Sequence, residues 1–372
     1  MSDPDPQVHA LTLRRAALSA WLDDGGGLER ALSENLVVAF LGSASSGKDS
    51  GIKALFGLDF GEVSPIPGST DRVRVARLDE AGKVLLVNAP GFGDVRQGVD
   101  DKAREVMGAV DVVVYVVNCE GGATADERND LDEIRKLGRP VLVCLNKIDL
   151  IRARDRDTFV SATLAQLGVD PENAVVTAFD PLPQLAPAPI GVEEVVNWIG
   201  EQLASSGKTL LFAKHLRNKA AACEPLIQAA ARNASLAGAV PIPGADLAAV
   251  TAIQVKLIRD IAAVHGQSLD RDMVAFILAE LLAVGGRGFV RWGMEALKAA
   301  GMMPGGQIAE GLILAASATV AGASTYGVGQ AAVKWIQSGH TISADSLREV
   351  FDGAAFGWSK RKSGRSGKSG GA

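Results

Sequence analysis

The stretch Leu36–Ser50 reads LVVAFLGSASSGKDS and places a glycine-rich loop directly after a short apolar run. A strand that leads through such a loop into a helix is the setting of a phosphate-binding loop. Its backbone N–H groups and the positive end of the helix would hold phosphate oxygens, while the Lys48 ammonium would neutralise the β and γ oxygens. We expect the following residues to contact phosphate: Gly42, Ser43, Ala44, Ser45, Ser46, Gly47, Lys48, Asp49 and Ser50.

Five further apolar runs follow in the first half of the chain, separated by polar stretches of helical character. Runs that are apolar on both faces and alternate with helices indicate a mostly parallel sheet covered on both sides. The six expected strands cover residues 36–41, 73–78, 84–87, 112–117, 141–145 and 174–177. We therefore predict an α/β domain over residues 36–204, with a mostly parallel sheet.

Two later motifs would complete a nucleotide site, because a sheet of this kind binds ligands at the carboxyl edge of its strands. The fifth run is followed by NKID, which comprises Asn146, Lys147, Ile148 and Asp149. The Asp149 carboxylate can accept guanine N1–H and N2–H, which adenine does not offer, and Asn146 can reach the O6/N7 edge. Thr177 and Ala178 end the sixth run and could place a backbone N–H on guanine O6. The spacing thus selects guanine.

A phosphate sensor and a switch loop are expected elsewhere in the same domain. The third run leads into NAPG at residues 88–91, where the Gly91 N–H would contact the γ-phosphate. The loop before the second run contains PGSTD at residues 67–71. Thr70 in that loop could help to hold Mg²⁺ through its hydroxyl.

With these motifs in this order, residues 36–203 resemble the small G domain of translation-factor-class GTPases and are similar in layout to the bacterial Era and MnmE group. The motifs that carry the resemblance are PGST, APG and NKID. It implies binding of GTP and GDP, slow hydrolysis of GTP to GDP and phosphate, and a conformational switch. The loop GSASSGKDS also resembles that of dynamins, whose serine at the position of Ser45 holds a monovalent cation. The candidate catalytic residues are then Lys48, Ser45, Thr70 and Gly91.

Two residues depart from the family pattern at the expected metal site. Asp49 stands where the family has a serine or threonine that binds Mg²⁺, and Asn88 stands where it has an aspartate. One hypothesis is an exchange, in which Asp49 supplies the carboxylate in a site formed by Asp49, Thr70 and Asn88. The other is that metal binding and hydrolysis are weakened. Phe92 occupies the position of a water-orienting glutamine, so that group would come from the switch loop, a second protomer or a partner.

Beyond Lys208 the strand pattern vanishes, and we predict an all-α domain over residues 205–357. Residues 311–333 carry no charge and are long enough to span a bilayer, yet their many small residues would equally suit a buried helix. Both alternatives stay open. The motif PIPGAD at residues 241–246 resembles the YcjF-like domain of unknown function, which implies membrane association.

The two ends of the chain and its charge distribution indicate which kinds of partner and location to expect. Residues 1–35 are expected to form a helical lead-in, and residues 358–372 a disordered basic tail. Residues 1–200 hold 20 basic and 31 acidic groups, whereas residues 201–372 hold 18 and 12, which favours an anionic membrane surface for the second half. No stripe of basic and aromatic residues is present, so nucleic acid is not an expected partner. The acidic, proline-rich start lacks the basic and apolar regions of a secretory signal and indicates a cytoplasmic chain. Association with the inner membrane is expected of the helical half alone.

These features together predict a GTP-binding switch protein whose G domain controls a helical effector domain. One alternative is a dynamin-like protein that self-assembles on a membrane or scaffold, with a homodimer formed through the G domains. Another is a GTP-binding protein with impaired hydrolysis. Either way, the expected ligands are GTP, GDP and Mg²⁺.

Overall fold

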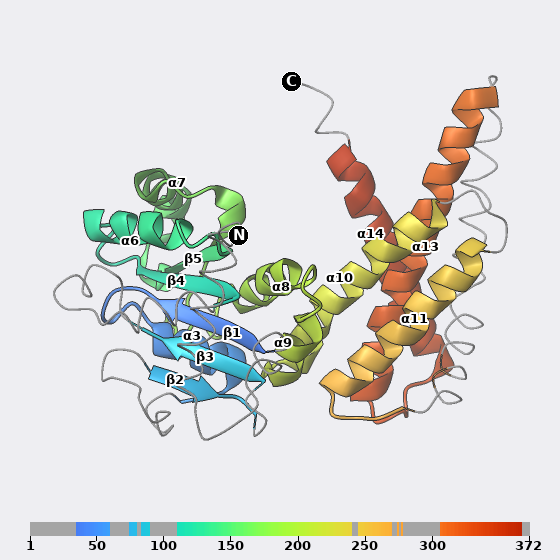
Figure 1. Ribbon diagram of the computed structural model, residues 1–372, viewed down its shortest axis with the longest axis horizontal. Helices are drawn as coiled ribbons and strands as arrows, with labels where there is room; N and C mark the ends of the chain where they lie inside the picture. Colours follow the sequence, from blue (N-terminus) through green and yellow to red (C-terminus); the bar gives the residue numbers. More distant parts are fainter. Residues whose placement is uncertain are drawn as a thin grey trace, which may run out of the picture. The chain divides into compact units, whose positions relative to one another are not determined.

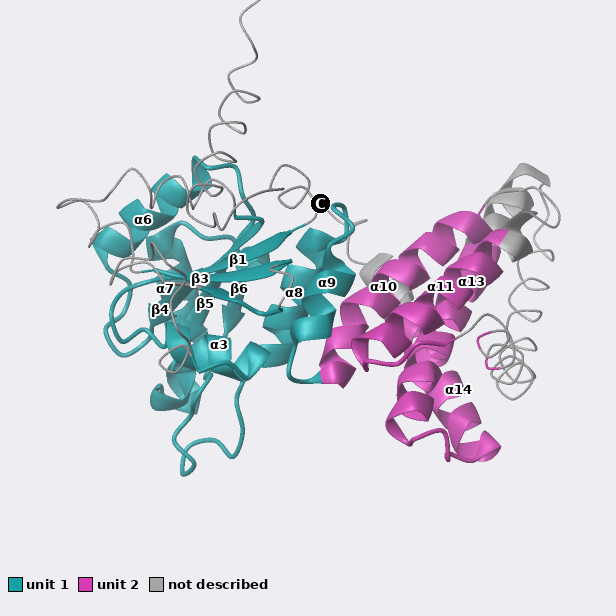
Figure 2. Cartoon of the chain, turned by 60° about the horizontal axis from the view of Figure 1, so that its bottom comes forward, with its two compact units in different colours: residues 1–218 teal, residues 219–372 magenta. Residues whose placement is uncertain are grey.

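The computed structural model describes residues 35–59, 74–79, 83–89, 110–239, 245–269, 274, 277 and 306–366. The expected lead-in helix, Thr70, Gly91, Phe92 and the first residues of PIPGAD lie outside these ranges. The chain divides into two compact units, residues 1–218 and residues 219–372 (Figure 2).

The first unit is built on a mostly parallel sheet (Figure 1). Its described strands are β1 Leu36–Leu41, β2 Arg74–Arg77, β3 Val84–Asn88, β4 Val112–Asn118, β5 Val141–Asn146 and β6 Ala174–Val176. Their order is β2-β3-β1-β4-β5-β6, in which β2 is antiparallel to β3 and the other neighbours are parallel. Ala39 of β1 pairs with Val87 on one side and Val113 on the other. The predicted α/β class is confirmed.

Helices cover both faces of this sheet (Figure 1). They are α3 Lys48–Phe56, α6 Ala125–Arg135, α7 Arg156–Leu167, α8 Val192–Leu203 and α9 Thr209–His215, with short 3₁₀ helices η1 Ile148–Leu150, η2 Ala153–Asp155 and η3 Pro171–Asn173. Leu131 of α6 and Leu164 of α7 join one core cluster with alternate residues of the strands. α3 contacts β1, and α8 contacts β4 and β5. The helices therefore cover the faces of the sheet, while the carboxyl ends of the parallel strands lie along one edge of it.

The first unit extends to Asn218, beyond the predicted boundary at residue 204. The Lys208 ammonium pairs with the Asp111 carboxylate at 2.8 Å, and the Phe212 ring lies 6.0 Å from the Phe56 ring. The Arg217 N–H donates to the Leu55 carbonyl at 2.8 Å. These contacts hold α9 within the first unit, because they bury its polar and aromatic groups against α3 and the sheet.

The second unit is helical, as predicted, with α10 Lys219–Gly238, α11 Ala245–Val264, α13 Gly306–Gln337 and α14 Ala344–Ser366. α13 contacts all three other helices. A Cβ added at Gly322 would lie 2.1 Å from Ser235 Oγ, and one added at Gly329 would lie 2.7 Å from Ile227 Cγ1. The small residues of α13 thus allow close packing of its neighbours, which is the buried alternative of the two left open by the sequence. Within the described ranges, no helix combines the length and apolarity that a membrane crossing requires.

Residues 358–366, the first part of the tail that was expected to be disordered, are helical, and residues 367–372 lie outside the described ranges. α14 continues as a helix to Ser366, and Trp358 is buried. A Cβ added at Gly322 would lie 2.4 Å from the Trp358 ring, so this side chain is packed against α13. Burial of a tryptophan stabilises a helix that its basic and serine-rich sequence alone would not favour.

Candidate nucleotide-binding site

The loop between β1 and α3 has a backbone that two glycines make possible. The φ angles of Gly42 and Gly47 are 139° and 97°, and Ser45 also has a positive φ of 58°. A Cβ added at Gly42 would lie 2.2 Å from the Val116 carbonyl oxygen, and one at Gly47 would lie 2.2 Å from Asn146 Nδ2. Only glycine fits both the conformation and the space at these positions. The loop is therefore held tightly against the ends of β4 and β5.

Lys48, the first residue of α3, lies back across this loop. Its ammonium donates to the Gly42 carbonyl at 2.9 Å and to the Ser43 carbonyl at 2.8 Å. These contacts place a positive charge above a loop whose following helix also presents its positive end. The arrangement can bind a phosphate chain, as the sequence predicts.

One buried hydroxyl in the same loop has no protein partner. Ser46 is fully buried, and its Oγ forms no hydrogen bond with any described residue. An unpaired buried hydroxyl is uncommon, and a ligand oxygen or an ion at this loop would satisfy it.

Asp49 and Asn88, the two departures from the family pattern, are in direct contact. The Asn88 amide Nδ2 donates to Asp49 Oδ1 at 2.5 Å. Asn88 is buried at the end of β3, whereas Asp49 is exposed on α3. A serine and aspartate pair would place the donor on α3 and the carboxylate on β3. Here the donor and the carboxylate have exchanged elements, so one carboxylate is kept at the site.

The residues present fit a magnesium ion that is bound largely by nucleotide. Mg²⁺ is commonly held by one or two carboxylates together with phosphates and waters, and Asp49 supplies one accessible carboxylate. Among the described residues, no group of three or more histidine, cysteine or acidic side chains could hold a metal by itself.

Asn146 joins three loops at the edge of the sheet. Its Nδ2 donates to the Ser46 carbonyl at 2.8 Å, and its Oδ1 accepts from the Phe179 N–H at 3.1 Å and the Thr177 hydroxyl at 3.3 Å. The sequence suggested that Asn146 reaches the O6/N7 edge of guanine. Asn146 thus holds the phosphate loop against the segment after β6. Its amide nitrogen carries a second N–H donor, so the contact with guanine stays a prediction.

Asp149 is nearly buried, with 7% of its surface exposed, and lies in η1 directly after β5. Its Oδ2 accepts the Leu182 N–H at 3.3 Å, which orients the carboxylate. Burial, the Asp149 carboxylate and the Glu127 carboxylate raise the pKa of the neighbouring Cys119 thiol to about 12. The thiol therefore stays neutral, and Asp149 faces no second negative charge from it. A low-polarity surrounding of this kind makes an unmatched hydrogen bond to Asp149 costly.

Lys147 is fixed by a residue that the sequence did not single out. The Lys147 ammonium pairs with Glu120 Oε2 at 3.0 Å, just after β4. The hydrogen bond from Lys147 and its charge lower the pKa of Glu120.

The prediction that Thr177 or Ala178 presents a backbone N–H to guanine O6 is not supported by the hydrogen bonds. The Thr177 N–H donates to the Leu145 carbonyl at 2.8 Å, and the Ala178 N–H donates to the Ile190 carbonyl at 3.1 Å. The Thr177 N–H continues the pairing of β6 with β5, and the Ala178 N–H is used because the chain returns at Ile190 and pairs with it. A single apolar residue before Gly191 was the only sequence signal for this bridge.

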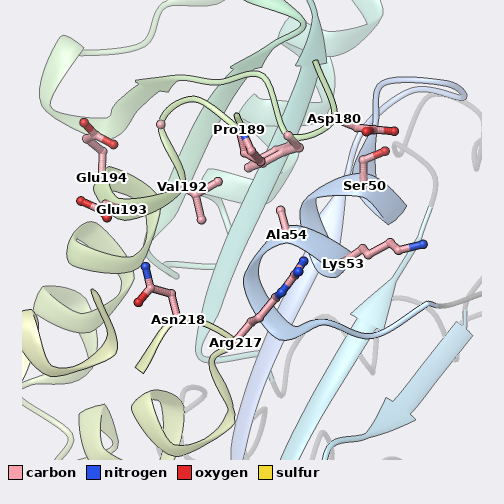
Figure 3. A pocket seen from close by; sticks show the side chains of 12 residues that line it. Ser50, Lys53, Ala54, Asp180, Pro189, Val192, Glu193, Glu194, Arg217 and Asn218 are labelled. Carbon is pink, nitrogen blue, oxygen red and sulfur yellow. The ribbon is translucent and has the colours of Figure 1, made fainter. Parts of the chain in front are cut away.

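A pocket of about 770 Å³ lies beside the phosphate loop, between α3 and the start of α8 (Figure 3). Ser50 and Asp180 lie together at one end, and Arg217 lies beside Ala54. Phe179, also missed by the sequence, lines the pocket and packs on α3, since a Cβ added at Gly51 would lie 3.0 Å from its ring. Of the residues predicted to bind nucleotide, Ser50 alone lines this pocket.

Comparisons with known proteins match both units. Residues 37–147 match the family model described as 50S ribosome-binding GTPase, and residues 205–355 match a domain of unknown function, DUF697. GTPase Era of Borreliella afzelii is 23% identical over 171 residues, which cover 45% of this chain and 56% of that protein. GTPase Der of Stenotrophomonas maltophilia is 34% identical over 119 residues, which cover 30% of this chain and 26% of that protein. The chain thus spans about half the length of the Era relatives and a quarter of that Der.

One solved structure that is similar to this chain is the FeoB G-domain from Methanococcus jannaschii. The two have a TM-score of 0.31 and 18% identical residues over 46% of this chain and 99% of that one. The fold, the phosphate loop and the sequence matches define the first unit as a P-loop G domain of the GTP-binding GTPase class. The chain joins a G domain similar to Era and Der to a helical, YcjF-like domain of the DUF697 family.

Proposed function

We propose that this chain binds GTP and GDP at the carboxyl edge of the sheet, hydrolyses GTP slowly, and uses the nucleotide state to control its helical unit. The proposal is carried by one observation: Asn146 ties the loop that carries Lys48 to Phe179, in the segment whose Leu182 N–H donates to Asp149. A phosphate-binding charge and a guanine-selecting carboxylate are thereby fixed relative to each other. Whether an anionic membrane surface or a second copy responds to the switch remains a prediction from the sequence.

The proposal is tested by titrating the full chain with GTP and with ATP in a calorimeter, followed by measurement of phosphate release. We expect GTP to bind at least about 100-fold more tightly, because a buried acceptor that meets no donor is penalised by about 1–3 kcal/mol and Asp149 would meet two donors in guanine. Slow phosphate release from GTP should accompany binding. Equal affinity for ATP and GTP would contradict the proposal.

We further propose that Asp49 takes over the carboxylate contact to Mg²⁺ and that Asn88 positions it. The Mg²⁺ ion would supply charge neutralisation to the β- and γ-phosphates when bound. The hydrogen bond between Asn88 and Asp49 supports this exchange, since it fixes the single carboxylate of the pair at the first turn of α3. The alternative from the sequence is a weakened metal site. It predicts that the effect of Asp49 on Mg²⁺ binding does not depend on the residue at position 88.

A double-mutant cycle on Asp49→Ser and Asn88→Asp distinguishes the two hypotheses. Asp49→Ser alone leaves the ion without either carboxylate, so the increase in GTP affinity caused by Mg²⁺ should fall. The double variant restores the family arrangement and should recover that increase, with a coupling of about 0.5–3 kcal/mol between the sites. GTP affinity is measured with saturating Mg²⁺ and with chelator for all four proteins. Additive effects, or a wild type indifferent to Mg²⁺, would favour the weakened site.

The description of the matched family also raises a ribosomal partner, which the sequence did not lead us to expect. Sedimentation of the full chain with ribosomal subunits in the presence of GTP or GDP separates a ribosomal role from a membrane role.

A further inference from the structure

The helix and the strand that meet at the expected metal site are joined there by one hydrogen bond. Asp49 lies in the first turn of α3, and Asn88 ends β3. The Asn88 amide donates to the Asp49 carboxylate, so the two elements are linked at this point. A nucleotide phosphate, or the ion that accompanies it, at Asp49 would therefore act on both elements at once. The contacts at their far ends then decide which part of the chain responds.

The far end of α3 is held by α9 and by the residues that follow it. The last carbonyls of a helix have no partner within the helix, and the Leu55 carbonyl accepts the Arg217 N–H at 2.8 Å. The Phe56 ring lies 6.0 Å from the ring of Phe212, which is fully buried in α9. Because protein interiors are close-packed, α3 cannot shift without moving α9.

The antiparallel pair of β2 and β3 also ends at α9. Arg74 pairs with Asn88, so Asp79, which follows β2, lies at the end of the pair farthest from Asn88. Asp79 Oδ1 accepts the Lys83 N–H at 2.7 Å, and Asp79 Oδ2 lies 3.5 Å from Nε2 of His215 in α9. The side chains of Asp79 and His215 are only 23% and 20% exposed. Solvent therefore screens this contact less than it screens the exposed ion pairs of the unit.

We propose that α9 responds to the nucleotide state through both elements and passes the response to α10, with the contact between His215 and Asp79 as the link to the strands. This proposal rests on the proposed function, because it supplies a route by which nucleotide controls the helical unit. α9 ends at His215 and α10 begins at Lys219, so a displacement of α9 is carried directly along the chain to α10. A purely structural role predicts that the contacts of α9 are equally firm with either nucleotide.

The test measures hydrogen exchange of the full chain by mass spectrometry, with GDP and with a non-hydrolysable GTP analogue. We expect the amides of residues 212–217 to exchange about tenfold more slowly with the analogue, because its γ-phosphate is expected where α3 and β3 meet. In His215→Leu this difference should disappear, while the affinities for both nucleotides change by less than about twofold. His215→Gln should keep the difference, since its amide nitrogen can donate to Asp79 in place of Nε2.

Lys53→Ala is the matched control, because it removes an exposed ion pair with Asp59 near the same end of α3. It should keep the difference between the two nucleotide states. The thermal midpoint shows whether His215→Leu is folded, and the comparison of the two states in the wild type does not depend on that variant.

Three results would overturn the proposed route. If residues 212–217 exchange equally in both states while α10 to α14 respond, the route is wrong and the proposed control of the helical unit stands. If a folded His215→Leu protein keeps the difference, the strands are not part of the route. If the wild type binds no guanine nucleotide, the proposed function fails and the route fails with it.

Discussion

Lys48→Ala is expected to lower the affinity for GTP and GDP by about 100-fold or more. The Lys48 ammonium lies across the loop at hydrogen-bond distance from the Gly42 and Ser43 carbonyls, where phosphate oxygens would meet it. Each charge-assisted hydrogen bond contributes about 1.5–3 kcal/mol, so the loss of two to phosphate accounts for this reduction. The affinity is measured by equilibrium titration of the full chain with a fluorescent GDP analogue.

The control for this variant is Lys53→Ala, one and a half turns further along α3. The Lys53 ammonium is 3.1 Å from the Asp59 carboxylate, and its side chain is 62% exposed. Exposed ion pairs of this kind contribute about 0–1 kcal/mol, so both the fold and the affinity should be retained. Circular dichroism should show that Lys48→Ala is also folded. Unchanged GDP affinity in a folded Lys48→Ala protein would mean that the phosphate site lies elsewhere.

The strands and the phosphate loop could be predicted because their signals are local. The apolar run Leu36–Leu41 and the glycines that follow are contiguous, and the structure has the strand at the predicted residues. A glycine was needed at residue 42 because the Val116 carbonyl comes so close, although the sequence does not reveal that neighbour. Composition and spacing thus predict which residues form the loop, while the contacts that fix it depend on strands far along the chain.

The contacts of Asn146 and Ala178 with other parts of the chain could not be predicted for the same reason. Each was assigned to the base from its position after a strand. In the structure, Asn146 bonds Ser46, a hundred residues earlier, and Ala178 pairs with Ile190 across a proline-rich segment. These partners depend on how loops of particular lengths close, and loop closure has no short sequence signature. The contact between Asp49 and Asn88 was the exception, since both departures from the family pattern fell at the same expected metal site.

The second large effect is expected from Asp149→Asn, which should lower guanine nucleotide affinity by about 10- to 100-fold and favour xanthine nucleotides. In the wild type, the Leu182 N–H donates to Asp149 Oδ2 at 3.3 Å. In the variant, the same N–H would donate to the side-chain oxygen of the asparagine. The amide nitrogen of the new side chain would then face the base. Its N–H groups would oppose the N1–H and N2–H donors of guanine, at a cost of about 1–3 kcal/mol for each buried unpaired group.

Xanthine reverses this mismatch, because it carries an acceptor oxygen where guanine has its N2 amino group. The variant should therefore bind xanthosine diphosphate more tightly than GDP, as measured by competition against a fluorescent GDP or xanthosine analogue. Asp155→Asn is the matched control, since that carboxylate is 55% exposed and pairs with the neighbouring Arg154. It should leave the preference for guanine unchanged. If a folded Asp149→Asn protein still preferred guanine, another group would select the base. The buried Asp149 carboxylate would then serve only to hold the Leu182 backbone through its hydrogen bond.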